Sequence, residues 1–139
     1  MKRVVIVISI VAVLAGVITA YLIFRPSKTA QIAILETNWS GEKDYVPTEQ
    51  ATTYRVKSGD VIRCGGIVDF EVTVSKISND SVTIKTNTPM SSIEEPYVDL
   101  DADETRFTLP NDKSLRLVTP TLDAGDIYIF SILKIDEEK

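Results

Sequence analysis

The chain begins with a continuous run of apolar residues, whereas apolar and polar residues are mixed in the rest of the chain. Residues 4–24 are apolar except for four uncharged interruptions, at Ser9, Gly16, Thr19 and Tyr21. A helix rises about 1.5 Å per residue, so this run reaches roughly 30 Å, the thickness of the hydrocarbon layer of a bilayer. Because lipid offers the backbone no hydrogen-bond partner, a single crossing segment must be helical. The run therefore predicts a transmembrane helix.

The apolar run has two interpretations, an uncleaved anchor and a signal peptide. A signal peptide has an apolar region of roughly 7–15 residues, followed by small residues before the cut. Here the run is longer, and a cut after Ala20 would leave the apolar residues 21–24 at the new terminus. The sequence favours an anchor over residues 1–28, including its basic flanks, and a single domain over residues 29–139.

The charges on either side of the run give the expected orientation. Lys2 and Arg3 precede it, and Arg25 and Lys28 follow it, so the positive-inside rule gives an even count. The very short N-terminal flank favours a cytoplasmic N-terminus. We therefore expect a single-pass membrane protein whose C-terminal domain is extracytoplasmic, a location that suits a chain with one cysteine.

A short linker is expected over residues 25–30, and from Tyr54 to Lys57 the pattern changes to the two-residue period of half-buried β-strands. Residues 31–37 are a possible first strand, and the polar residues 38–53 are interpreted as a loop. The clearest alternation covers residues 68–75 and returns over residues 81–85, which predicts a hairpin with a bulge near Lys76 and Ile77.

The last third of the chain predicts further strands. Residues 105–109 and 115–117 flank a turn at Pro110 and are expected to form a second hairpin. Residues 127–135 are apolar on both faces, which is typical of a central strand covered on both sides. We expect the core to include seven side chains from these strands: Phe70, Val72, Ile84, Phe107, Leu117, Ile129 and Phe130.

Seven or eight short strands separated by turns predict an all-β fold after the N-terminal helix. The spacing favours a small antiparallel sandwich, and a small β-barrel is the alternative. The strand pattern resembles that of immunoglobulin-like or fibronectin-like modules, particularly in the turn before the last strand (residues 122–126). The chain lacks the cysteine pair and the intervening tryptophan of true immunoglobulin domains, so no family is assigned on this resemblance.

The charge of the domain restricts its partners. Residues 29–139 carry 11 basic and 20 acidic side chains, a formal charge of −9. Such a domain repels phosphate backbones, so nucleic acid is not an expected partner. The chain has no histidine, which removes the commonest general base, and Cys64 is its only cysteine. We expect Cys64 to have a structural role, and we find no catalytic or cofactor motif.

Two stretches could still carry a binding function. Asp99, Asp101 and Asp103 copy the opening of a calcium loop, but Glu104 and Pro110 stand where such a loop needs glycine and glutamate. The stretch is therefore a weak metal candidate, and a solvated acidic loop is the favoured interpretation. Separately, two aromatic side chains in the polar stretch 38–53 could contact a sugar or a protein partner, or could cap the sandwich: Trp39 and Tyr45.

The expected function follows from these features together. The sequence predicts a non-enzymatic accessory module, anchored in the membrane through residues 4–24, that binds another protein. The alternative is a ligand- or calcium-binding extracytoplasmic domain that uses the Asp99–Asp103 loop. No cofactor is expected.

Overall fold

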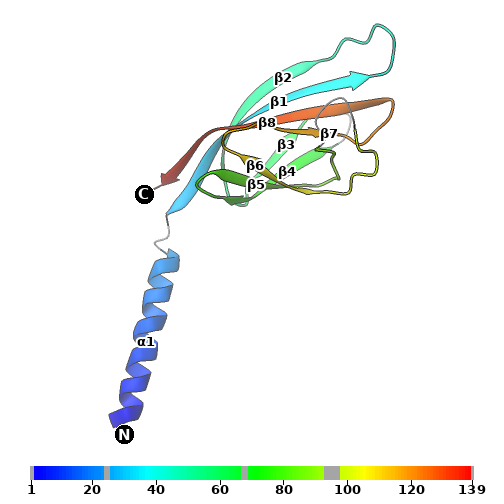
Figure 1. The fold of residues 1–139 in the computed structure, drawn as a ribbon. Helices are drawn as coiled ribbons and strands as arrows, with labels where there is room; N and C mark the ends of the chain where they lie inside the picture. The colour runs from blue at the N-terminus through cyan, green and yellow to red at the C-terminus, as the bar shows by residue number, and fades with distance from the viewer. Residues whose placement is uncertain (1, 24–25, 67–68, 93–97, 139) are drawn as a thin grey trace.

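Over the residues that it describes, the computed structural model of the chain contains one helix and eight strands, which Figure 1 shows in their arrangement. It describes residues 2–23, 26–66, 69–92 and 98–138, and within the helix it describes the side chains of residues 9–20. The elements are α1 (Lys2–Ile23), β1 (Ser27–Ser40), β2 (Glu49–Lys57), β3 (Val61–Cys64), β4 (Phe70–Ile77), β5 (Ser81–Thr86), β6 (Arg106–Pro110), β7 (Leu115–Val118) and β8 (Ala124–Glu138).

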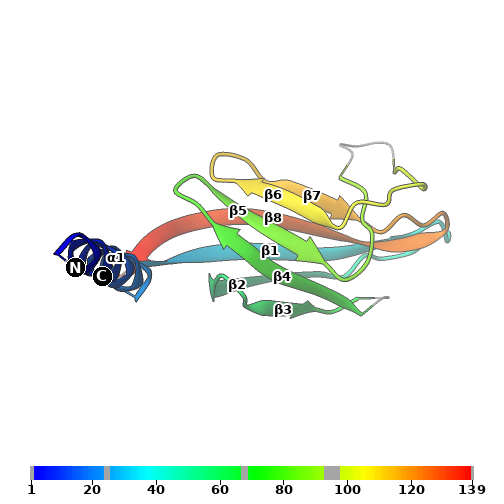
Figure 2. The same cartoon turned by 90° about the horizontal axis from the view of Figure 1, so that it is seen from below.

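The strands form two antiparallel sheets of four strands each. The first sheet has the order β2-β1-β8-β7, and the second sheet has the order β3-β4-β5-β6. One continuous cluster of buried side chains joins the inner faces of the two sheets, which lie one over the other (Figure 2). The predicted all-β sandwich is confirmed, and the strands do not close into the alternative barrel.

The core follows the two-residue alternation of the strands. Six of the seven predicted core residues are buried, and the rings of Phe70 and Tyr128 stack across the two sheets with centroids 4.2 Å apart. Ile129 was expected in the core but is only half-buried, because its neighbours Tyr128 and Phe130 point inward and successive side chains of a strand alternate between faces.

The extent of the first two strands was predicted wrongly. β1 begins at Ser27, inside the expected linker, and continues to Ser40, whereas β2 begins at Glu49. Only residues 41–48 of the expected loop connect strands. β2 pairs with β1 over its whole length, from Lys57 with Thr29 to Glu49 with Thr37, although its residues 49–53 are polar or small. Backbone pairing needs no apolar side chain, so the sequence pattern ended before the strands did.

One predicted hairpin is confirmed and the other is wrong. β4 pairs with β5, and the register shifts between Val74 and Lys76, as a bulge requires. β6 and β7 flank the expected turn but do not pair with each other. β6 pairs with β5 in the second sheet and β7 pairs with β8 in the first, so the turn crosses from one sheet to the other.

The last strand is central, as predicted, but it is not covered on both sides. β8 lies between β1 and β7 and buries Tyr128, Phe130 and Ile132 on its inner face. On the outer face Ile129 is half-buried, and Leu133, which is 57% exposed, lies where the β1–β8 register shifts. The outer face of β8 is therefore only partly buried.

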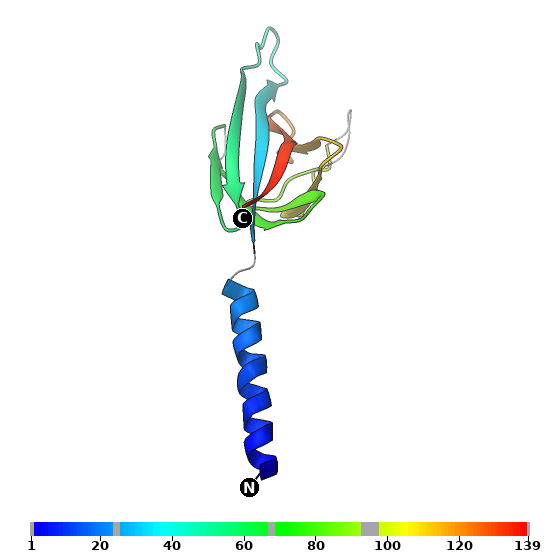
Figure 3. The same ribbon diagram turned by 90° about the vertical axis from the view of Figure 1, so that its left-hand side faces the viewer.

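α1 precedes the sandwich and points away from it (Figure 3). Within the part of the chain that the structure describes, no helix has both the length and the apolarity needed to cross a bilayer.

Candidate functional site

The end of the sandwich that lies farthest from α1 is formed by loops (Figures 1 and 2). Three of them define what we call the distal end: residues 41–48, 98–104 and 119–123. Backbone hydrogen bonds join the loops to one another and to the sheets. The N–H of Gly41 donates to the carbonyl oxygen of Asp123 at 2.8 Å, and Ser91 and Val118 exchange two bonds of 2.9 Å.

Trp39 is the second-last residue of strand β1 and does not lie in a loop, contrary to what the sequence suggested. It is half-buried and pairs with Gly125 of β8, where a Cβ atom would come within 2.8 Å of the indole Nε1. The missing side chain of Gly125 therefore makes room for the indole ring. Nε1 itself is buried and has no hydrogen-bond partner among the described residues. This packing favours the capping interpretation of Trp39.

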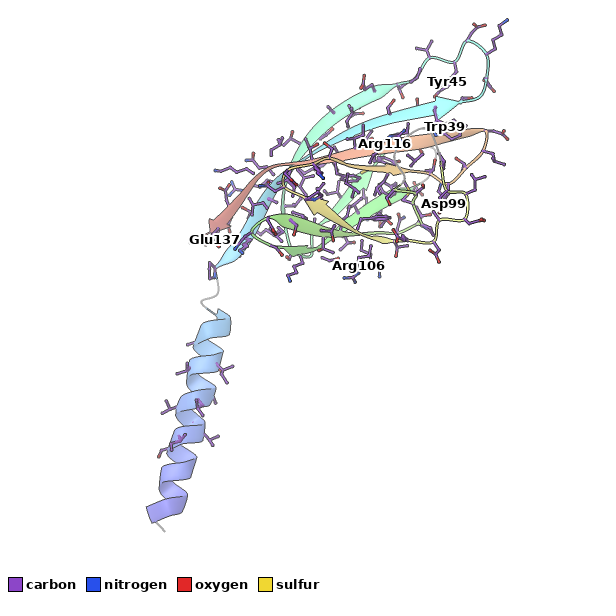
Figure 4. All side chains as sticks on the ribbon, viewed as in Figure 1. Trp39, Tyr45, Asp99, Arg106, Arg116 and Glu137 are labelled. Carbon is purple, nitrogen blue, oxygen red and sulfur yellow. The ribbon has the colours of Figure 1, made fainter. Side chains whose placement is uncertain are left out.

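Tyr45 lies in the loop at the tip of the β1–β2 hairpin, farther out than Trp39 (Figure 4). Its side chain is 37% exposed, and that of Val46 beside it is 79% exposed. On the neighbouring loop, Leu122 is 74% exposed. The sequence singled out Tyr45 but missed Val46 and Leu122, since single aliphatic residues in loops give no periodic signal.

Side-chain hydrogen bonds hold the hairpin tip in place. The Asn38 amide donates to Thr48 Oγ1 at 2.8 Å and accepts from the Thr48 N–H at 2.9 Å. Ser40 Oγ accepts from the N–H of Glu42 at 3.2 Å. These bonds close the loop at its base and present Tyr45 and Val46 on an ordered support.

The acidic loop is ordered by polar contacts of its own. The N–H of Asp99 donates to Ser91 Oγ, and the N–H of Asp101 donates to Asp99 Oδ1, each at 3.1 Å. Asp99, Asp101 and Asp103 are all exposed. Asp99 and Asp103 line a shallow pocket of about 240 Å³ beside Met90, and Asp101 does not line it. The acidic residues 94 and 95, which belong to the same sequence cluster, lie outside the described residues.

The structure does not bring the three aspartates together as metal ligands. Among the described residues, no group of three or more cysteine, aspartate or glutamate side chains is placed to hold a metal ion. Asp101 does not line the pocket that Asp99 and Asp103 share, and its backbone N–H donates to the Asp99 carboxylate.

A second pocket, which the sequence did not predict, lies between the two sheets near the distal end. It measures about 220 Å³ and its lining includes Glu36, Glu49, Asp126 and Tyr128. Asp126 is 2% exposed, and Thr119 Oγ1 accepts a hydrogen bond of 2.9 Å from its N–H. These four residues come from β1, β2 and β8, and Gly65 and Gly66, which follow β3 of the other sheet, also line the pocket, so it forms only when the two sheets come together.

Cys64 and Tyr128 lie at this end of the core and remain protonated at neutral pH. Burial, followed by the charge of Glu36 and a hydrogen bond to it, raises the pKa of the Cys64 thiol to about 12. Burial, followed by the charge of Asp126, raises the pKa of the Tyr128 hydroxyl, which donates to the Gly65 carbonyl oxygen at 2.8 Å. A buried, protonated thiol is a poor nucleophile, in keeping with a structural role for Cys64.

The distal end is strongly acidic as well as partly apolar. Its three loops carry seven acidic side chains and a single lysine: Glu42, Asp44, Asp99, Asp101, Asp103, Glu104 and Asp123, with Lys43. A surface of this composition attracts basic groups and repels phosphate.

Comparisons with known proteins give no guide to which of these features has a function. The distal loops and the two pockets are therefore interpreted from their own residues. No protein-family model matches this chain, and no characterised protein or solved structure matches it either.

Proposed function

We propose that this chain is a non-enzymatic binding module, anchored in a membrane by one N-terminal helix, whose distal end contacts another protein on the extracytoplasmic side. One observation carries the proposal. α1 and the exposed apolar loop residues lie at opposite ends of the molecule (Figure 1).

The anchor is supported by the composition of α1 and its flanks. Residues 4–24 contain no charged side chain, whereas two basic residues stand on either side of the run. The described apolar side chains of α1 are exposed rather than packed against the sandwich: Ile10, Val11, Val13, Leu14, Val17 and Ile18. An apolar helix with no protein surface to cover it is stabilised by lipid.

The partner is inferred from the chemistry of the distal end. Tyr45, Val46 and Leu122 offer apolar contact area within a surface that is otherwise acidic. The complementary surface combines apolar and basic side chains, which describes a protein better than a nucleic acid or an anionic lipid surface. The alternative, a ligand- or calcium-binding loop, is less well supported because Asp101 lies outside the pocket that Asp99 and Asp103 line.

The anchor is tested with a charge placed inside the apolar run. Arginine at the centre of a membrane helix costs about 2.5–3.5 kcal/mol on insertion scales. We expect the full-length protein to stay in the membrane fraction through an alkaline wash, and Leu14→Arg to shift a large part of it to the soluble fraction. Leu14→Ala is the control and should behave like the unchanged chain. Release of the unchanged chain by the wash would contradict the anchor.

The partner contact is tested separately by photo-crosslinking in intact membranes. A photoreactive amino acid at Val46 should give a discrete adduct with another protein, and the same group at Lys113, in the turn between β6 and β7, should not. Replacing Leu122 by serine should weaken the Val46 adduct without changing the melting temperature, because this side chain is 74% exposed. Equal adducts from both positions would argue against a distal binding site.

A further inference from the structure

Each sheet of the sandwich has two edge strands, and these edges differ greatly in length. β3, β6 and β7 have four, five and four residues, and β6 ends in Pro110, whereas β2 has nine residues and contains neither proline nor glycine. Proteins protect exposed edges with short strands, proline and bulges, because an open edge pairs with further strands. β2 is the edge that lacks these protections.

The backbone of β2 has groups available for such pairing. At its end, the N–H of Lys57 donates to Asp60 Oδ2 and its carbonyl oxygen accepts from the N–H of Asp60, so both groups face away from β1. Outward and inward groups alternate along an antiparallel strand. The N–H and C=O groups of Arg55, Thr53, Ala51 and Glu49 therefore face outward, and among the described residues no second strand pairs with this edge of β2.

The charges of β2 are arranged to match those of a second β2 strand. Glu49 begins the strand and Arg55 lies six residues later, and both residues are exposed. Their even spacing places them on the same side of the strand. When two β2 strands run antiparallel about a two-fold axis at Thr52, Glu49 of each copy lies opposite Arg55 of the other. The same register places Ala51 opposite Thr53 and Thr52 opposite Thr52. It leaves Lys57, whose backbone groups are already bonded, outside the pairing.

We infer that two copies of this chain associate through their β2 edges and continue the first sheet from one sandwich into the other. The four outward-facing residues of each strand form the hydrogen-bonded pairs, and the two Glu49–Arg55 pairs select the antiparallel register. Arg55 also lies 3.6 Å from Glu138 of its own chain, through an exposed contact that leaves its guanidinium accessible. A second copy fits this edge better than an arbitrary strand because the charge pattern complements itself.

The antiparallel pairing fixes where the two N-terminal helices lie. β2 runs from the distal end towards the end that carries α1, so the pairing sets the distal end of one copy beside the α1 end of the other. The two α1 helices then leave from opposite ends of the dimer. If both are membrane anchors, as proposed above, the two copies belong to facing membranes. The pairing itself does not depend on that proposal, and it is tested in detergent.

The first test reverses the charges of β2 in the full chain, with the dissociation constant of the dimer measured by sedimentation at a large excess of detergent micelles. Cross-strand pairs of like charge are destabilising, so Glu49→Arg and Arg55→Glu should each raise the dissociation constant about tenfold. The double variant regains opposite charges and should return to within about threefold of the unchanged chain. Lys85→Glu, the same charge change on β5, is the control and should have no effect.

The second test depends on the two-fold axis and not on charge. In this register Thr52 of one chain lies opposite Thr52 of the other chain as a non-hydrogen-bonded pair. The two Cα atoms are then about 4.5 Å apart, which is close enough for a disulfide between cysteines at this position. In a Cys64→Ala background, Thr52→Cys should form a covalent dimer on mild oxidation. Lys113→Cys, exposed in the β6–β7 turn, should stay monomeric under the same conditions.

Three results would overturn the inference. The unchanged chain could remain monomeric at every concentration, or the double charge variant could dimerise no better than the single ones. Thr52→Cys could also crosslink no faster than Lys113→Cys. The melting temperature of every variant is compared with that of the unchanged chain, so that a loss of pairing is not confused with a loss of folding.

Discussion

Phe70→Ala is expected to destabilise the domain by about 3–5 kcal/mol, the range found when a large buried aromatic side chain is removed. Phe70 is 1% exposed and stacks on Tyr128, so the change leaves a cavity between the two sheets and removes a ring contact. Small domains have a total stability of roughly 5–15 kcal/mol, so the variant should be close to its folding limit. Urea unfolding of the full chain in detergent, followed by near-ultraviolet circular dichroism, measures the loss.

The matched control for this prediction is Val61→Ala on the adjacent strand β3. Val61 pairs with Thr73 of β4 but its side chain is 52% exposed, so its removal should cost less than about 1 kcal/mol. If both alanine variants unfolded at the same urea concentration, the burial assigned to Phe70 would be wrong.

Gly66→Ala is expected to cost about 2–5 kcal/mol, from backbone strain and overpacking together. Gly66 has a φ angle of +134°, a conformation that residues with a Cβ rarely adopt. An added Cβ would also lie 2.6 Å from Asp126 Oδ2 and 2.6 Å from the Tyr128 hydroxyl. Both side chains are buried, and the Tyr128 hydroxyl is held by its bond to Gly65, so neither can move away freely. Thermal unfolding of the full chain measures the effect.

Gly65→Ala provides the control at the next position. A Cβ at residue 65 would have Glu36 Oε2 as its nearest neighbour, at an ordinary contact distance of 3.6 Å. This variant should lose less than about 1 kcal/mol, because neither strain nor overlap is introduced. A larger loss for Gly65→Ala than for Gly66→Ala would contradict the conformation described for this pair of glycines.

Much of the sandwich could be predicted from the sequence because side-chain alternation is a local property. The alternation from Phe70 to Val74 requires one buried face and predicts β4 correctly, and the return over residues 81–85 predicts β5. The slip at Lys76 was also visible, since an extra residue in a strand breaks the alternation at one point. Of the six predicted core residues that are buried, five belong to such alternating segments or to strand β7, and the sixth, Phe130, belongs to β8, which is apolar on both faces.

Strand segments without an apolar face could not be found in this way: the alternation of residues 54–57 indicated the end of β2, but residues 49–53 were interpreted as a loop. β2 is exposed over most of its length, and its position is fixed by backbone pairing with β1, which leaves no mark on side-chain composition. The partner of each strand also cannot be predicted from the residues of that strand alone. The segments around Pro110 look like one hairpin, but their strands join different sheets, because each finds its partner among residues distant in the sequence.

The candidate sites show the same division. The order of the residues was enough to identify the apolar run of residues 4–24, the acidity of the domain, the alternating strands, and the candidates Tyr45 and Asp99. Three features became visible only in the folded domain: the packing of Trp39 over Gly125, the position of Asp101 outside the pocket of its neighbours, and the open edge of β2. Periodicity and charge are properties of residues that are close in the sequence. Burial, pockets and free strand edges depend on which distant strands become neighbours in the fold.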